Sequence, residues 1–124
     1  MRISKLLKTK GSQVYTVSPD TTVYDALKLM AEKEIGALVV VESDIMVGIF
    51  SERDYARKVI LKGRNSLATL VREIMTTKVV YASPRKKIRK CIALMIKHHV
   101  RHLPILQDEK LVGIISIEDV LSLL

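Results

Sequence analysis

Two short segments of the chain have the residue types needed to bind a polar ligand. Both read glycine, two apolar residues, serine, two further residues and aspartate, at Gly48–Asp54 and at Gly113–Asp119. An ionised aspartate accepts strong hydrogen bonds, for example from two adjacent hydroxyl groups. A serine at the start of a helix lies beside free backbone N–H groups that favour a phosphate. The same Ser-x-x-Asp spacing also forms a capping box that only stabilises a helix, and the motif by itself leaves both interpretations open.

The two segments belong to a longer internal repeat. Residues 17–59 align with residues 82–124 without a gap, and ten of the 43 pairs are identical. A gapless match of this length indicates two copies of one folding unit. We place the first copy at residues 1–66 and the second at residues 67–124, with the connection within residues 61–72.

Each copy is predicted to have the element order β-α-β-β-α. Apolar residues three and four apart predict one helix from Val23 and another over Ile88–His99, and a second helix is expected after Ser51 and after Ser116. The predicted strands are residues 14–17, 37–41 and 46–50 in the first copy and residues 79–82, 103–106 and 111–115 in the second. A copy of about 60 residues buries so little surface that it would be only marginally stable alone. We therefore expect an α+β fold in which the two copies pack by a pseudo-twofold into one module.

The repeat resembles a pair of CBS domains, also called a Bateman module, over nearly the whole chain. The resemblance rests on the two Ser-x-x-Asp motifs and on segments similar to the family's second strand and to the opening of a copy: Ile35–Val40, Val100–Ile105 and Val71–Thr76. The opening of the first copy, Leu6–Gly11, departs from the family pattern. The resemblance implies a small stand-alone module that pairs into homodimers, largely through its helices. The apolar C-terminal residues would fit burial at that interface or cap the core: Val120, Leu121, Leu123 and Leu124.

The resemblance also implies a regulatory ligand that contains adenosine: AMP, ADP, ATP, NAD or S-adenosylmethionine. It implies two clefts between the copies, in which the motif aspartate holds the ribose hydroxyls and the motif serine lies near phosphate. By the family arrangement, the Asp119 cleft would combine Ile114, Ser116, Arg101 and His102 with Ala26, Ile35 and Gly36. The Asp54 cleft would combine Ser51 and Ile49 with positive charge from Arg53, Lys86 or Arg101, and Val100 is a further candidate.

The Asp119 cleft is predicted to be the better phosphate site. Arg101 and His102 could neutralise phosphates there, and arginine is well shaped for that purpose. Their counterparts in the first copy, Gly36 and Ala37, carry no charge. Two chemically different ligands are therefore possible.

The leading hypothesis is a nucleotide sensor that signals to a separate target protein and is not an enzyme. A ligand-free dimeric adaptor is the alternative, and a nucleic-acid binder is a third. The net charge is +8, and the segment Arg53–Arg101 contains 14 of the 21 Lys and Arg but only two of the 13 Asp and Glu. Proteins that bind single strands usually add stacking aromatics to such charge, whereas this chain has no Trp and one Phe.

Several other residues suggest chemistry that the surrounding sequence does not support. His98 and His102 have the i, i+4 spacing of two metal ligands on a helix, but no second ligand cluster accompanies them. Cys91 lies on an apolar helix face, which predicts a buried structural thiol. As the single cysteine it cannot form an intrachain disulfide, which favours a reducing, cytoplasmic location. No apolar run approaches the length of a membrane span.

Overall fold

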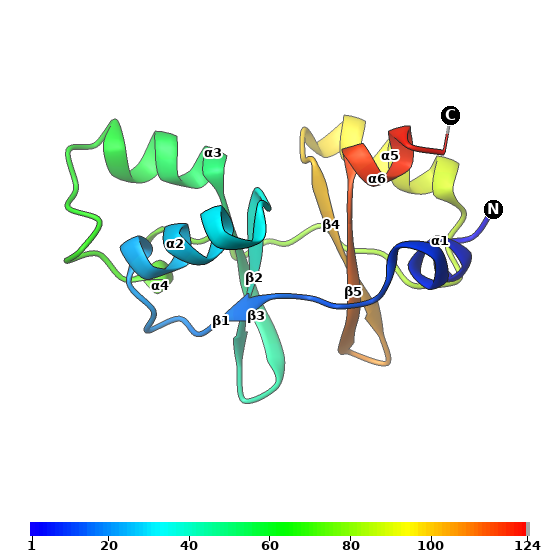
Figure 1. The fold of residues 1–124 in the computed structure, drawn as a ribbon, viewed down its shortest axis with the longest axis horizontal. Helices are drawn as coiled ribbons and strands as arrows, with labels where there is room; N and C mark the ends of the chain where they lie inside the picture. The colour runs from blue at the N-terminus through cyan, green and yellow to red at the C-terminus, as the bar shows by residue number, and fades with distance from the viewer. Residues whose placement is uncertain (124) are drawn as a thin grey trace. The chain divides into compact units, whose positions relative to one another are not determined.

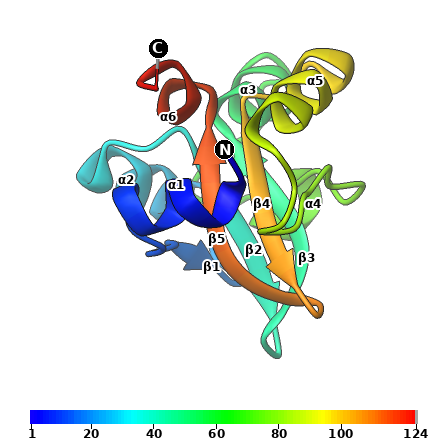
Figure 2. The same cartoon turned by 90° about the vertical axis from the view of Figure 1, so that its right-hand side faces the viewer.

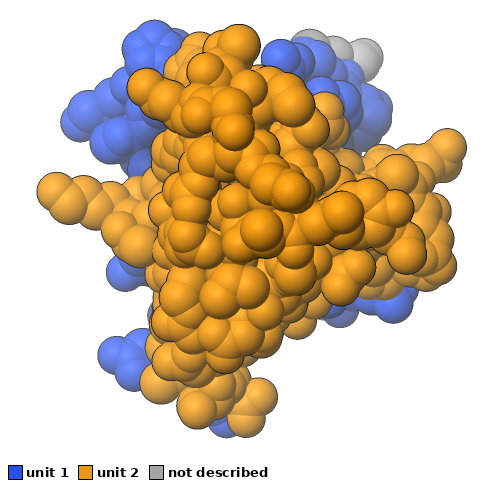
Figure 3. All heavy atoms as spheres, turned by 90° about the vertical axis from the view of Figure 1, so that its left-hand side faces the viewer, with its two compact units in different colours: residues 1–14, 80–124 blue, residues 15–79 orange. Residues whose placement is uncertain are grey.

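A computed structural model describes residues 1–123 of the chain (Figure 1 and Figure 2), which divide into two compact units (Figure 3). Unit 1 comprises Met1–Val14 and Val80–Leu124, and unit 2 comprises Tyr15–Val79. The two units differ from the two sequence copies. The first residues of the chain fold with the second copy, and the first residues of the second copy fold with the first copy. The copy boundary at residue 66 stays a prediction.

Unit 2 contains a three-stranded sheet in the order β1-β2-β3 (Figure 1). Strand β1 is parallel to β2, and β2 is antiparallel to β3. The helix that follows β3 continues as a π-helical turn over Ala56–Ile60. The remaining elements are β1 (Thr16–Val17), α2 (Val23–Lys33), β2 (Ala37–Glu42), β3 (Ile45–Ser51), α3 (Glu52–Tyr55) and α4 (Val71–Ile74).

Unit 1 contains the antiparallel pair β4-β5 (Figure 2). Its elements are α1 (Ile3–Lys10), α5 (Ile88–His98), β4 (His102–Gln107), β5 (Lys110–Ser116) and α6 (Ile117–Leu121). Both units thus repeat a helix, a hairpin and a short helix, and the α+β class predicted from the sequence is confirmed.

The long helices bury the faces that the apolar spacing predicts. Helix α2 buries Val23, Ala26 and Met30. Its first turn is capped by Thr22, whose hydroxyl accepts from the N–H of Asp25 at 3.1 Å. A left-handed residue, Glu34, ends the helix.

Helix α5 follows the same plan with two exceptions. Ile88, Cys91 and Met95 are buried. Ile96 was predicted on the same apolar face but is 67% exposed. His99 was also predicted there but is exposed and ends the helix in the left-handed region. Ile96 lies in the last turn of α5, and His99 is its C-cap residue.

The prediction of a strand over residues 79–82, at the start of the second copy, was wrong. Of residues 79–82, only Ala82 pairs, in an isolated parallel bridge with Ile105. In the first copy the predicted strand over residues 14–17 is reduced to Thr16–Val17. In each case Ser-Pro follows within one residue, and the strand ends there because proline lacks the N–H that the ladder needs.

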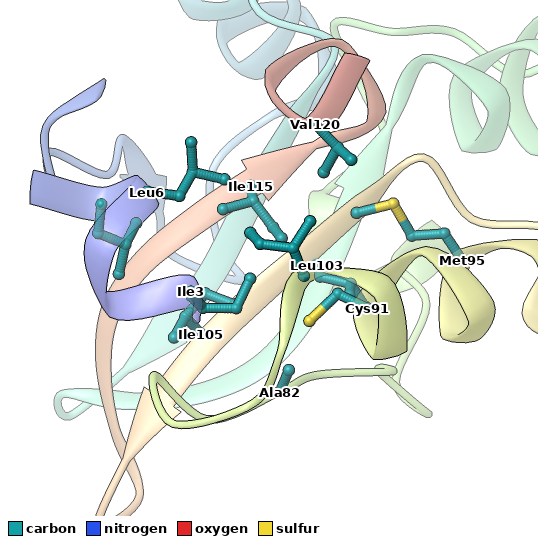
Figure 4. Packing of buried hydrophobic residues seen from close by; sticks show 11 residues of the cluster. Ile3, Leu6, Ala82, Cys91, Met95, Leu103, Ile105, Ile115 and Val120 are labelled. Atoms are coloured by element: carbon teal, nitrogen blue, oxygen red, sulfur yellow. The ribbon is translucent and has the colours of Figure 1, made fainter. Parts of the chain in front are cut away.

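Helix α1 completes the core of unit 1 (Figure 4). Its buried residues Ile3, Leu6 and Leu7 belong to one apolar cluster with residues of α5, β4, β5 and α6: Ile88, Cys91, Met95, Leu103, Ile105, Ile115 and Val120. In Figures 1 and 2 the helix lies beside β5, although the two are a hundred residues apart in sequence. Val120 is 3% exposed, so it caps the core within this unit. Leu124 lies outside the described residues.

The motif glycines allow an opening segment to approach the second strand of each hairpin. A Cβ atom at Gly48 would lie 2.9 Å from the carbonyl oxygen of Thr76 and 2.7 Å from Met75 Sδ. A Cβ atom at Gly113 would lie 2.7 Å from Cδ2 of Leu7. A Cβ atom would therefore crowd the neighbouring segment at both positions, against backbone at Gly48 and against a side chain at Gly113.

The two glycines should differ in their tolerance of a methyl group. We expect Gly48→Ala to lower the free energy of unfolding by about 1–3 kcal/mol, as overpacking usually does, and Gly113→Ala to lower it by less. The reason is that Gly48 faces backbone that is hydrogen-bonded to Ile49, whereas Gly113 faces a leucine methyl that can rotate away. Urea denaturation of the full chain measures both losses, and equal losses would contradict this account.

Candidate functional site

Both Ser-x-x-Asp motifs form capping boxes, at the first turns of α3 and α6. The Ser51 hydroxyl accepts from the N–H of Asp54 at 3.2 Å, and the Ser51 N–H donates to Asp54 Oδ2 at 3.0 Å. In unit 1 the corresponding distances between Ser116 and Asp119 are 3.1 Å and 2.8 Å. Because α6 has only five residues, its dipole adds little attraction for a phosphate, whereas α3 continues into the π-helical turn over Ala56–Ile60. At α6, nearby cations must supply most of that attraction.

Asp54 uses both carboxylate oxygens within unit 2. Oδ2 accepts from the N–H and the hydroxyl of Ser51, the hydroxyl at 3.1 Å. Oδ1 accepts from the Thr76 hydroxyl at 3.1 Å and lies 3.0 Å from Lys58 Nζ. The side chain is 9% exposed, so a ligand would have to replace bonds that already exist.

Asp119 is more accessible. The hydrogen bonds from the Ser116 N–H and from Lys10 Nζ, each 2.8 Å long, both end on Oδ2, so neither donor occupies Oδ1. The side chain is 25% exposed. Burial by itself would raise the pKa of Asp119, but the bonds from Lys10 and from the Ser116 backbone outweigh it and lower that pKa. The group is an ionised acceptor near neutral pH, as recognition of a diol requires.

The other candidates in unit 1 surround the start of α6. The Arg101 carbonyl oxygen accepts from the N–H of Ile117 at 2.8 Å. The Arg101 guanidinium lies 3.7 Å from Glu118, and both side chains are 67% exposed. His102 pairs with Ser116 across the β4-β5 hairpin. Val100 closes α5 through a bond from its N–H to the Met95 carbonyl.

Unit 2 repeats this arrangement with neutral residues. The Gly36 carbonyl oxygen accepts from the N–H of Glu52 at 3.1 Å, at the position that Arg101 has in unit 1. Ile49 exchanges two backbone hydrogen bonds with Thr76, each 2.9 Å long. Ala26 is fully buried in the core of unit 2, and Ile35 packs against that core. The assignment of Ala26, Ile35 and Gly36 to the Asp119 site stays a prediction.

Two candidates for the Asp54 site also remain predictions. Arg53 is exposed and follows the first residue of α3. Lys86 belongs to unit 1, where its charge favours the thiolate of Cys91. Burial has the larger effect on that thiol and raises the pKa of Cys91, which makes it the inert, buried cysteine that the sequence predicts.

Lys10 and Lys58 are the lysines bound to the two motif carboxylates, and the sequence prediction missed both. Lys58 could have been found, because it stands four residues after Asp54, the spacing of neighbours on a helix. Lys10 stands 109 residues before Asp119, and only the packing of α1 on unit 1 brings it there. Its Nζ also lies 2.6 Å from the carbonyl oxygen of Ile114, another predicted site residue.

The positive charge of the protein belongs to unit 1. Unit 1 has 12 Lys and Arg against 4 Asp and Glu, a net charge of +8, whereas unit 2 has nine of each and is neutral. A net positive field raises the local concentration of anions.

The described residues contain no group of three or more His, Cys, Asp or Glu side chains arranged to hold a metal ion. None of the helices in residues 1–123 is long and apolar enough to cross a membrane.

The model of the family described as the CBS domain matches residues 8–61 and residues 71–124. The chain therefore belongs to the CBS-domain family and is a pair of CBS domains, a regulatory module. It is 40% identical over 127 residues to the mitochondrial CBS domain-containing protein CBSX3 of Arabidopsis thaliana, covering 95% of this chain and 62% of that protein. It is 36% identical to YhcV of Bacillus subtilis, covering 94% of this chain and 83% of YhcV.

Solved structures show the same fold. A protein with CBS domains from Burkholderia ambifaria MC40-6 is 51% identical, with a TM-score of 0.94 and coverage of 98% of this chain and 92% of that one. The CBS pair of MJ0100, solved with 5′-methylthioadenosine and S-adenosyl-L-methionine, has a TM-score of 0.87 and covers 99% of this chain and 94% of its own. At 23% identity it shows the fold alone.

The lowered pKa of Asp119 predicts a dependence of stability on pH. Because its folded pKa lies below its unfolded value of about 3.9, ionised Asp119 stabilises the fold fully above that value, and the stabilisation is lost as pH falls through the folded pKa. Asp119→Asn should therefore be less stable than the wild type at pH 6, and the difference should shrink towards pH 3. Urea denaturation across this range measures it, and a constant difference would contradict the assignment.

Proposed function

We propose that the protein is a sensor that binds an adenosine compound at Asp119 and signals to a separate target protein without catalysing a reaction. The observation behind this proposal is the Asp119 carboxylate, which is ionised, a quarter exposed and bound through one oxygen by Ser116 and Lys10. The carboxylate can accept the pair of hydroxyls that a ribose presents, one at Oδ1 and the other at Oδ2 in place of the Lys10 ammonium. The Asp54 carboxylate is the second candidate site, and its two occupied oxygens make it the weaker one.

The family supports an adenosine ligand. The same fold in MJ0100 is solved with 5′-methylthioadenosine and S-adenosyl-L-methionine. AMP, ADP, ATP and NAD share the ribose diol of these compounds and add phosphate, which the charge of unit 1 favours. A ligand shifts the module between two arrangements only if it binds one of them more tightly. A cytoplasmic location and the absence of catalysis are part of the proposal.

Thermal unfolding with a panel of nucleotides tests the sensor. AMP, ADP, ATP, NAD, NADH and S-adenosylmethionine are compared with GMP as the control, and a ligand at a hundred times its Kd adds about 2.7 kcal/mol of stability. We expect a selective rise of the Tm that is abolished in Asp119→Ala, reduced or unchanged in Asp54→Ala, and retained in Glu32→Ala, a matched carboxylate on α2 paired with Lys33.

The alternatives give different results in the same experiment. A panel without any shift at millimolar concentration would overturn the sensor and favour the ligand-free adaptor, for which both aspartate variants lose only stability. Binding to DNA or RNA that falls steeply with salt, without a response to AMP, would favour a nucleic-acid binder.

A homodimer is the second part of the proposal. Leu121 and Leu123, at the C-terminal end of unit 1, are 55% and 40% exposed. Ile96 on α5, a helix that packs with α6, is 67% exposed. Large apolar side chains gathered on neighbouring elements are typical of an interface.

Charge at these leucines should separate the subunits. We expect the double variant Leu121→Glu with Leu123→Glu to elute with the mass of one chain, because burying two carboxylates at an interface is costly. The wild type should elute with the mass of two. Ile45→Glu, which changes an apolar residue of unit 2 that is 61% exposed, is the control and should remain dimeric. A wild type with the mass of one chain in multi-angle light scattering would refute the dimer.

A further inference from the structure

The two units place different cations beside their motif carboxylates. In unit 2 the cation is Lys58, one helical turn after Asp54. In unit 1 it is Lys10, the last residue of α1, whose ammonium bridges Asp119 Oδ2 at 2.8 Å and the Ile114 carbonyl at 2.6 Å. The carboxylate in unit 1 is therefore bound by an element from elsewhere in the chain.

The hydrogen bonds that Lys10 makes in unit 1 correspond to bonds that neutral groups make in unit 2. The carbonyl of Ile49, the counterpart of Ile114, accepts from the backbone N–H of Thr76, and the Thr76 hydroxyl donates to Asp54. A backbone N–H is fixed in place and carries no net charge. Lys10 makes both bonds, to the carbonyl and to the carboxylate, with a charged ammonium at the end of a flexible side chain. Its ammonium can leave Asp119 without any break in the backbone hydrogen bonds.

On the basis of the proposed function, we infer that Lys10 determines which adenosine compound the Asp119 site takes. The ribose hydroxyls replace the ammonium at Asp119, and the ammonium then binds the 5′-phosphate of the same ligand. The site therefore takes adenosine 5′-phosphates in preference to neutral or cationic adenosyl compounds. Lys10 is a specificity-determining residue that the motif itself does not contain.

The preference follows from the charges. The displaced ammonium keeps its charge and needs an anion, which AMP supplies a few bonds away from its diol. Adenosine supplies no anion. S-adenosylmethionine has a carboxylate, but a sulfonium group stands where AMP has its 5′-phosphate, and the net positive charge of the compound repels the ammonium. The net charge of +8 on unit 1 acts in the same direction. The short helix α6 has too weak a dipole to replace these cations.

Calorimetric titration of the full chain with AMP, adenosine and S-adenosylmethionine tests the role of Lys10. We expect the wild type to prefer AMP over adenosine by about tenfold or more, which is 1.4 kcal/mol. Lys10→Met should lose most of that preference because its affinity for AMP falls. Its affinity for adenosine should stay the same or rise, because no ammonium then competes for Asp119. Lys10→Arg, which keeps the charge, and Lys8→Met, which removes a neighbouring charge on α1, should both retain the preference.

The outcomes separate this inference from the proposed function. An AMP-to-adenosine ratio that is equal in the wild type and Lys10→Met overturns the role of Lys10 and leaves the sensor in place. A wild type that binds none of the three compounds, and none of ADP, ATP, NAD and NADH in the thermal panel, overturns both. Salt supplies a measurement independent of any variant, because screening should lower the wild-type ratio, and a ratio indifferent to salt also overturns the inference.

Discussion

The close approach of an opening segment to the motif strand underlies the structure of each unit. It is possible because Gly48 and Gly113 lack a side chain, so that Thr76 lies against one strand and Leu7 against the other. In unit 2 the contact is made by backbone and fixes the Thr76 hydroxyl beside Asp54. In unit 1 it is made by side chains of α1 and places a lysine there. One packing solution therefore gives two sites with different chemistry.

The capping role of the motif and a binding role use different atoms of the same residues. The Ser116 hydroxyl accepts from the N–H of Asp119, and the Ser116 N–H donates to Asp119 Oδ2, so these two capping bonds do not involve Oδ1. In unit 2 the Ser51 hydroxyl adds a second bond to Oδ2, and Thr76 and Lys58 reach Oδ1. Capping is therefore compatible with binding at Asp119 and competes with it at Asp54. Both motifs share the Ser-x-x-Asp pattern, and the surrounding donors decide the difference.

The repeat, the helix faces and the hairpins could be predicted from sequence because they depend on periodic burial within a short segment. The predicted strand over residues 79–82 failed for a physical reason: its single pair, between Ala82 and Ile105, depends on packing rather than on β-propensity. The exchange of opening helices between copies could not be predicted either. The departure of Leu6–Gly11 from the family pattern gave no sign of where this segment packs. Its helix buries Leu6 and Leu7 against the second copy.

The same limit applies to the candidate site. Asp54, Asp119 and their serines were found because the repeat aligns them, and Lys58 lies within one helical turn of Asp54. Lys10 has no such relation to Asp119, since only the tertiary fold joins them. Lys10 also links the Asp119 carboxylate to α1, a helix that belongs to the core of unit 1. Any group that replaces Lys10 at Asp119 releases a tether at the C-terminal end of α1, while Ile3, Leu6 and Leu7 hold the rest of that helix in place. Occupancy of the site would therefore alter one end of one helix without loosening the core.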